Sequence, residues 1–202
     1  MNASRHGKAD VLAAAIRLLD EVGLPDLTMR KLATTLDVQP SALYWHYANK
    51  QSLLAEVSNT IVGFAKPVSP AETWQETTKL QAIALRDALL AFRDGAEVVS
   101  STLALGLGAD SALEKLEESI AIEYRALAHA AAESILFLVL GQVWHEQQRM
   151  QADSLGVVAP AVAAHPDEVN RTTDSGRGPA DSLEFGIGLI LDGLAKKLST
   201  AR

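Results

Sequence analysis

The 202-residue chain contains no cysteine. Disulfide bonds and zinc sites with cysteine ligands are therefore excluded, and the composition is consistent with a reducing compartment. The first ten residues, MNASRHGKAD, lack the apolar run of a secretory signal, so we expect a cytoplasmic protein. The hydrophobic content of 48% nevertheless allows a substantial core.

The sequence also lacks an apolar run long enough to cross a membrane. Its most apolar segment, residues 125–150, has an apolar core at 135–144 that is flanked by His129, Glu133 and His145. A membrane-spanning helix needs about 20 apolar residues, roughly twice that length. We therefore expect no membrane partner, and we interpret the segment as a helix buried at a subunit interface.

Common enzyme motifs are missing as well. The chain has neither a Gly-x-Ser-x-Gly elbow nor a P-loop, and the glycine-rich residues 106–111 follow no predicted strand. His145 and Glu146 begin a zinc-protease pattern, but Arg149 stands where the second histidine is needed. No Glu-x-x-His pattern of di-iron bundles occurs. We predict that the chain is not an enzyme and has neither a cofactor nor a metal site.

Basic residues are fewer than acidic ones, 18 against 25, and the net charge is −7. Residues 1–66 carry seven basic and six acidic side chains, so the acidic excess lies in the C-terminal part. A mildly positive N-terminal part can still bind phosphates, because distant charges are screened beyond roughly 8 Å. Charge alone does not indicate DNA binding.

Residues 27–54, LTMRKLATTLDVQPSALYWHYANKQSLL, have the pattern of a helix-turn-helix. Thr28 can N-cap a helix over 29–36, and three turn residues follow. Pro40 suits the first position of a second helix over 40–46. In this motif the second helix enters the major groove, while residues at its end bind phosphates.

Aromatic residues crowd this second helix. Tyr44, Trp45 and His46 lie within about two turns, and Leu43 is its main aliphatic anchor. We interpret the three rings and Lys50 as DNA-facing. The alternative is that the rings fill the small core of a three-helix domain.

Hydrophobic periodicity predicts helices on both sides of the motif. A helix over 8–22 ends at Gly23, and the three-helix unit ends near Tyr47. Asn49 then caps a connecting helix over 50–66. A ligand that displaces the far end of this helix can reorient the helix-turn-helix; the alternative is a simple connector.

The C-terminal part is also predicted to be helical. A long helix is expected to start at the capping box Ser69-Pro70-Ala71-Glu72 and to end near Asp94, before Gly95. A second helix is capped by Asp110 and ends near Ile122, and the apolar helix over 125–150 follows. A loop over 153–181 with one short helix then leads to a final helix capped by Asp181.

Three glycines in the final helix, Gly186, Gly188 and Gly193, predict close helix packing. Each glycine costs a helix about 1 kcal/mol, so packing must offset the cost. Together with the helix over 125–150, they predict a homodimer through a four-helix bundle. A dimer places two recognition helices in successive major grooves, about 34–36 Å apart.

The chain resembles the tetracycline-repressor (TetR) family. The segments LTMRKLA, LYWH and NKQSLL match its helix-turn-helix, and ETW, ALLAFRDGAEV and FGIGLILDGLAKKL resemble its ligand domain. The resemblance implies an all-α fold with a three-helix helix-turn-helix DNA-binding domain over 1–48, a connecting helix over 49–66, and a larger helical ligand-binding and dimerisation domain over 67–202. It implies a homodimeric repressor that binds a palindromic operator in double-stranded DNA and is released by a small-molecule effector.

The resemblance also assigns DNA contacts. The family's base-reading arginine corresponds to Arg30, its aromatic and phosphate-binding positions correspond to Tyr44, Trp45, His46 and Lys50, and Thr28 is a further phosphate contact. The recognition helix departs from the family pattern at two positions, where Pro40 and Ala42 replace a glutamine and a threonine. We therefore expect a different operator there, with Gln39 as the substitute reader of adenine.

Ligand contacts are implied among the helices over 69–94, 110–122 and 125–150. The implied positions are Lys66, Gln81, Leu85, Val99, Thr102 and His129, with His145 from the other subunit. Val99 and His145 replace the family's magnesium-binding histidine and its supporting carboxylate, and an aliphatic side chain offers Mg²⁺ no ligand atom. We therefore do not expect recognition of a magnesium–tetracycline chelate, and we expect an apolar effector, aromatic or polyketide-like, while the presence of another divalent metal stays open. For His129 the alternative is a satisfied core histidine.

Two functions of other classes stay open at this point. One is a metabolite-binding helical dimer without specific DNA binding, and the other is an all-α enzyme. Repression rather than activation is implied by the resemblance and by no single residue.

Overall fold

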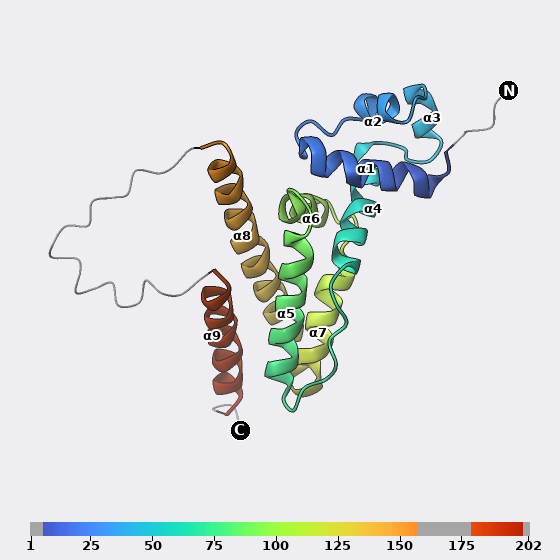
Figure 1. The fold of residues 1–202 in the computed structure, drawn as a ribbon. Helices are drawn as coiled ribbons and strands as arrows, with labels where there is room; N and C mark the ends of the chain where they lie inside the picture. Colours follow the sequence, from blue (N-terminus) through green and yellow to red (C-terminus); the bar gives the residue numbers. More distant parts are fainter. Residues whose placement is uncertain (1–5, 157–178, 200–202) are drawn as a thin grey trace.

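The computed structural model describes residues 6–156 and 179–199, and within these two ranges it contains helices and no β-strand (Figure 1). This confirms the predicted all-α fold. The helices are α1 (Lys8–Val22), α2 (Met29–Thr35), α3 (Pro40–Tyr44), α4 (Lys50–Gly63), α5 (Trp74–Leu90), α6 (Gly95–Ala104), α7 (Asp110–Tyr124), α8 (Ala128–Ser154) and α9 (Pro179–Ser199).

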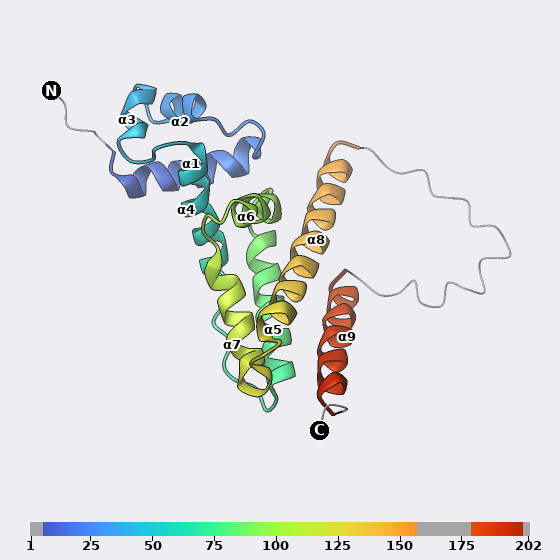
Figure 2. The ribbon, with the colours of Figure 1, turned by 180° about the vertical axis from the view of Figure 1, so that it is seen from behind.

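The helices form two parts joined by α4. Helices α1–α3, here called the head, lie at one end of the molecule, and α5–α9, the body, extend away from it (Figures 1 and 2). Helix α4 starts under the head and runs down beside α5 and α7. One apolar core is continuous through both parts and includes Leu19, Leu53, Ile61, Leu89 and Leu116.

Local start signals in and beside the head are confirmed. Thr28 Oγ1 accepts a hydrogen bond from Lys31 N at 3.1 Å, and Asn49 Oδ1 accepts one from Ser52 N at 2.8 Å. Pro40 is the first residue of α3. Helices α3 and α4 both end earlier than predicted: α3 ends two residues before its predicted end, and α4 ends three residues before its own.

The predicted start of the long helix at Ser69 is wrong. Thr73 caps α5, and its Oγ1 accepts a hydrogen bond from Glu76 N at 3.2 Å. The segment over 64–73, here called the strap, is not helical, and Ala71 N donates to Thr77 Oγ1 at 2.9 Å. Two Ser/Thr-x-x-Glu patterns lie four residues apart, and only the connection from α4 decides between them.

We expect Thr73→Ala to lower the free energy of unfolding by about 1 kcal/mol, because the α5 cap is lost. Ser69→Ala is the matched control and is expected to change it by less than about 0.5 kcal/mol. Urea denaturation at equal protein concentration measures both. A loss for Ser69→Ala as large as that for Thr73→Ala would refute the cap assignment.

Gly95 begins α6 instead of ending the long helix, which already stops at Leu90. Asp94 has a left-handed backbone with φ 55°, and a Cβ on Gly95 would collide with the Leu89 carbonyl oxygen. The chain therefore changes direction in a turn that has no space for a side chain at Gly95.

Other predicted bounds also shift. Asp110 and Asp181 lie in the first turns of α7 and α9 and do not cap them, because those helices begin at Asp110 itself and at Pro179. Helix α8 begins and ends later than the predicted range. Most of the segment 153–181, in which one short helix was expected, lies outside the described residues. The described part of this segment includes the end of α8 and the start of α9.

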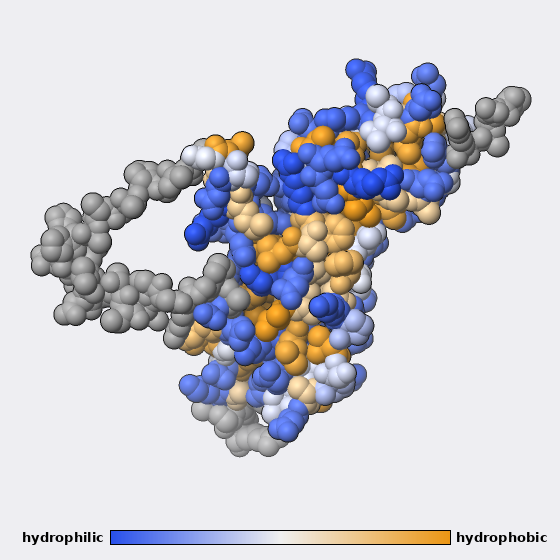
Figure 3. Space-filling model, in the orientation of Figure 1, coloured by the Kyte–Doolittle hydropathy of each residue, from blue (hydrophilic) through white to orange (hydrophobic). Residues whose placement is uncertain are grey.

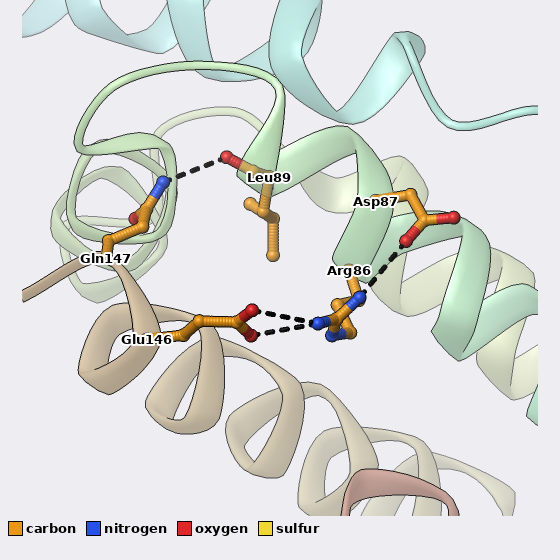
Figure 4. Close-up of polar contacts among 5 residues, drawn as sticks. All are labelled: Arg86, Asp87, Leu89, Glu146 and Gln147. Carbon is orange, nitrogen blue, oxygen red and sulfur yellow. Dashed lines mark hydrogen bonds and ion pairs between the residues drawn. The ribbon is translucent and has the colours of Figure 1, made fainter. Parts of the chain in front are cut away.

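Polar side chains join α5 to α8 in the body (Figure 4). Arg86 Nη2 donates to both carboxylate oxygens of Glu146, at 3.0 and 2.9 Å. Gln147 Nε2 donates to the Leu89 and Phe92 carbonyl oxygens, at 3.1 and 2.8 Å. These bonds satisfy carbonyl groups at the C-terminal end of α5, so α8 fixes the position of the α5–α6 turn.

Hydrophobic side chains reach the surface of the body (Figure 3). On α8 and α9 the exposed large hydrophobic residues include Phe137, Trp144 and Leu189. A Cβ on Gly186 would approach Leu138 Cδ2 at 3.0 Å, so this glycine already packs against α8 of its own chain. No described helix is long and apolar enough to span a membrane.

Candidate nucleic-acid interface and ligand cavity

The turn between α2 and α3 has the geometry of a helix-turn-helix. Val38 N donates to the Ala33 carbonyl oxygen at 3.0 Å, and Asp37 has a left-handed φ of 53°, which aspartate tolerates better than most residues. Leu43 is 1% exposed and is the one buried residue of α3. A single aliphatic side chain therefore anchors this five-residue helix to the head.

The rings of Tyr44 and Trp45 are exposed by 51% and 88%, respectively. Tyr44 is the last residue of α3 and Trp45 is its C-cap, and α3 lies at the end of the molecule away from the body (Figure 1). The alternative that these two rings fill the core is therefore wrong. Tyr47, to which the sequence assigned no role, is the aromatic residue buried here, and burial and then the nearby Glu56 raise its pKa to about 12.

His46 and Lys50, two further predicted DNA contacts, make hydrogen-bond contacts within the chain. His46 Nε2 lies 3.2 Å from the His6 carbonyl oxygen. Lys50 Nζ donates to the Leu24 carbonyl oxygen at 3.3 Å, and partial burial lowers the pKa of Lys50. Both side chains are part-buried.

The remaining predicted DNA contacts lie beside these residues on α2 and α3. Arg30 is exposed in the first turn of α2. The N-cap of this helix, Thr28, is exposed too, whereas Met29 between them is buried. Gln39 is the exposed N-cap of α3 and makes no side-chain cap bond, while Ala42 is half-buried. The structure thus leaves Arg30 and Gln39 available to a partner.

Asp94 connects the head to the body. Its carboxylate is buried, and its Oδ2 accepts a hydrogen bond from Leu24 N in the α1–α2 loop at 2.8 Å. Its Oδ1 accepts one from Gln151 Nε2 of α8 at 2.5 Å. The adjacent Arg93 donates to the Glu21 carbonyl oxygen at 3.0 Å. The α5–α6 turn therefore binds α1, the loop after it and α8 at once.

A cavity of about 380 Å³ lies where α4, the strap, α5 and α7 meet. Its lining is mostly apolar, and the lining residues are Val62, Gly63, Ala65, Lys66, Pro67, Val68, Gln81, Ala84, Leu85, Ala112, Lys115 and Leu116. Three predicted ligand positions, Lys66, Gln81 and Leu85, are among them. A hollow of about 580 Å³ shares four lining residues with this cavity: Lys66, Pro67, Val68 and Ala84.

The other four predicted ligand positions are not among the residues that line this cavity. Val99 is fully buried, and Thr102 Oγ1 donates to Ser58 Oγ at 2.8 Å, which ties α6 to α4. His129 is exposed, so the alternative of a core histidine is wrong; its hydrogen bond to Glu117 raises its pKa. His145 is exposed on α8 and borders a different hollow.

Sequence reasoning missed Lys115 and the strap residues other than Lys66 as parts of the cavity wall. Lys115 lies one turn before Ser119 and next to the buried Leu116, and the periodicity of α7 gives it no distinction from its exposed neighbours. Within the described residues no group of His, Asp and Glu side chains could hold a metal ion.

Residues 11–57 match the family described as bacterial regulatory proteins, tetR family, and residues 66–198 match the tetracyclin repressor-like C-terminal domain. The tetracycline repressor protein class C of Escherichia coli is 34% identical over 197 residues, which cover 92% of this chain and 89% of that relative.

Two solved structures are similar over nearly the whole chain. BioQ in complex with its natural double-stranded DNA operator has a TM-score of 0.76 and 36% identity, and the match covers 95% of this chain and 99% of that chain. A TetR variant from Acinetobacter baumannii AYE in complex with minocycline has a TM-score of 0.72 and 29% identity, covering 95% of this chain and 94% of that chain.

Proposed function

This chain belongs to the tetR family of bacterial regulatory proteins and is a DNA-binding transcriptional regulator, and we propose that it acts as a homodimeric repressor released by a small-molecule effector. The operator is a palindrome in double-stranded DNA, because two identical heads related by a two-fold axis read two half-sites. The metabolite-binding dimer without DNA binding is thereby set aside, and regulators of this family are not enzymes.

The exposed aromatic surface of α3 is the observation that carries the DNA-binding proposal. Trp45 is 88% exposed, although a tryptophan on a soluble domain is usually buried to a large extent. With Tyr44, Arg30 and Gln39 it forms a surface that is rich in groups able to contact bases and phosphates. Arg30 belongs to α2, Tyr44 belongs to α3, and Trp45 directly follows α3. Both helices lie at the free end of the head (Figure 1).

Helix α4 provides the route from effector to DNA. Its first residue, Lys50, binds the α1–α2 loop, and its end at Val62 and Gly63 lines the cavity. Between these ends, Asn59 Oδ1 accepts a hydrogen bond from Ala109 N at 2.6 Å. An effector that enlarges the cavity therefore moves a helix that is tied to both parts, and the spacing of the two heads changes.

The dimer forms through the exposed apolar faces of α8 and α9. Phe137, Gly141 and Trp144 follow each other at helical spacing on α8, and Leu189 is exposed on α9. A Cβ on Gly188 or on Gly141 would meet nothing within 4 Å in the isolated chain, which leaves space for a partner helix. Covering such a face removes apolar surface from water.

We expect Arg30→Ala to weaken specific operator binding by about 1–3 kcal/mol, because a guanidinium that contacts a guanine edge is lost. Gel shifts with duplexes cut from around the chain's own gene measure the effect, and light scattering gives the number of chains per duplex. Arg125→Ala, an exposed arginine of the body, is the matched control.

Unchanged operator affinity in Arg30→Ala removes this residue from the interface. No specific binding by the unsubstituted protein, or one chain per palindromic duplex, would contradict the proposed function itself.

A further inference from the structure

We propose that the effector bound in the 380 Å³ cavity is an amphipathic anion that carries an N–H or O–H donor. The sequence led us to expect an apolar effector without naming its charge. This inference rests on the proposed function, because it concerns the cavity to which that function assigns the effector.

The charge of the cavity wall is the first argument. Among the described residues that line the cavity, Lys66 of the strap and Lys115 of α7 are the charged ones, and neither Asp nor Glu is among them. Neither lysine forms an ion pair with another described residue. Both are exposed and so lie at the mouth of the cavity. Two unpaired cations beside an apolar wall favour an anionic group there.

The second argument is an unsatisfied acceptor. Gln81 Oε1 is buried and has no hydrogen-bond partner within the described part of the chain. A buried polar atom without a partner is unfavourable, and such atoms are uncommon in folded proteins. Because Gln81 lines this cavity, a ligand N–H or O–H that faces its Oε1 would supply the missing bond.

The rest of the wall selects the body of the ligand. Val62, Ala84, Leu85 and Leu116 are apolar and come from three different helices. The volume of about 380 Å³ lies in the range of small-molecule sites. The cavity thus suits an aromatic or aliphatic body with its anionic group at the mouth, beside the two lysines, and its donor at Gln81.

A pair of fluorescent probes tests the proposal on the full chain. 8-Anilinonaphthalene-1-sulfonate has an aromatic body, an N–H group and a sulfonate, and N-phenyl-1-naphthylamine is the same frame without the sulfonate. We expect the sulfonate probe to bind about tenfold more tightly. Lys66→Gln and Lys115→Gln are each expected to weaken it about three- to tenfold without changing the neutral probe.

Two further variants complete the experiment. Gln81→Leu is expected to weaken both probes, because both donate an N–H, and it keeps a side chain of similar size. Lys31→Gln changes an exposed lysine of the head and should leave both probes unaffected. If the sulfonate probe binds instead to the apolar faces of α8 and α9, its affinity will not change in the cavity variants.

Equal affinity for the two probes overturns the anionic effector, and so does sulfonate binding that is unchanged in both Lys66→Gln and Lys115→Gln. Gel shifts on the same preparations separate this result from a failure of the proposed function. If the variants still bind the operator specifically, the protein remains a DNA-binding regulator, and only the proposal of an anionic effector is excluded.

Discussion

Leu43→Ala is expected to weaken specific operator binding by a factor of about ten or more while the body stays folded. Leu43 is the one buried side chain of α3 and is 1% exposed. A helix of five residues has no stability of its own in water, so it depends on this anchor. Leu-to-Ala changes at buried sites cost about 2–5 kcal/mol. The recognition helix should therefore detach from the head before the rest of the core is affected.

Gel shifts and far-UV circular dichroism measure these two outcomes. Operator affinity should fall by a factor of about ten or more, whereas most of the helical signal, which comes from α4 to α9, should remain. Leu105→Ala is the matched control, because Leu105 is 60% exposed and lies in the body. If Leu43→Ala binds the operator like the unsubstituted protein, α3 does not present the DNA-contacting residues.

Asp94→Ala is expected to loosen the head from the body. The substitution leaves the buried Leu24 N and the part-buried Gln151 Nε2 without their acceptor, which costs about 1–3 kcal/mol. Alanine at a left-handed φ of 55° adds about 1 kcal/mol or more. Both effects act at the turn that binds α1, its loop and α8, so the damage is concentrated at the junction of the two parts.

Hydrogen exchange of the Leu24 amide gives the most direct measurement, since this amide donates to the Asp94 carboxylate. Its protection should be lost in Asp94→Ala and partly kept in Asp94→Asn, because asparagine retains one acceptor and tolerates the backbone. Asp26→Ala, an exposed aspartate of the same loop, is the control. Full protection in Asp94→Ala would show that this carboxylate does not hold the head.

The local signals of the sequence predicted the head well. The caps Thr28 and Asn49 and the proline that opens α3 were all correct, because each depends on a few neighbouring residues. The same kind of signal failed at Ser69, where a second capping pattern begins at Thr73. The strap has to cross from α4 to α5, and that requirement is not encoded within four residues.

The cavity was predicted only in part. Gln81 and Leu85 lie one turn apart on α5 and both line it, as expected from the resemblance. Thr102 is instead bound to Ser58, because α6 packs directly on α4. Lys115 comes from α7, and a residue on another helix cannot be assigned to a cavity from its own periodicity.

The sequence by itself determined the helical class, the helix-turn-helix and the family, because these depend on periodicity and on motifs of neighbouring residues. Only the tertiary structure decided which rings are exposed, which carboxylate joins the head to the body and which side chains face the cavity. These properties depend on distances between segments far apart in the chain, and it is packing of the core that sets such distances.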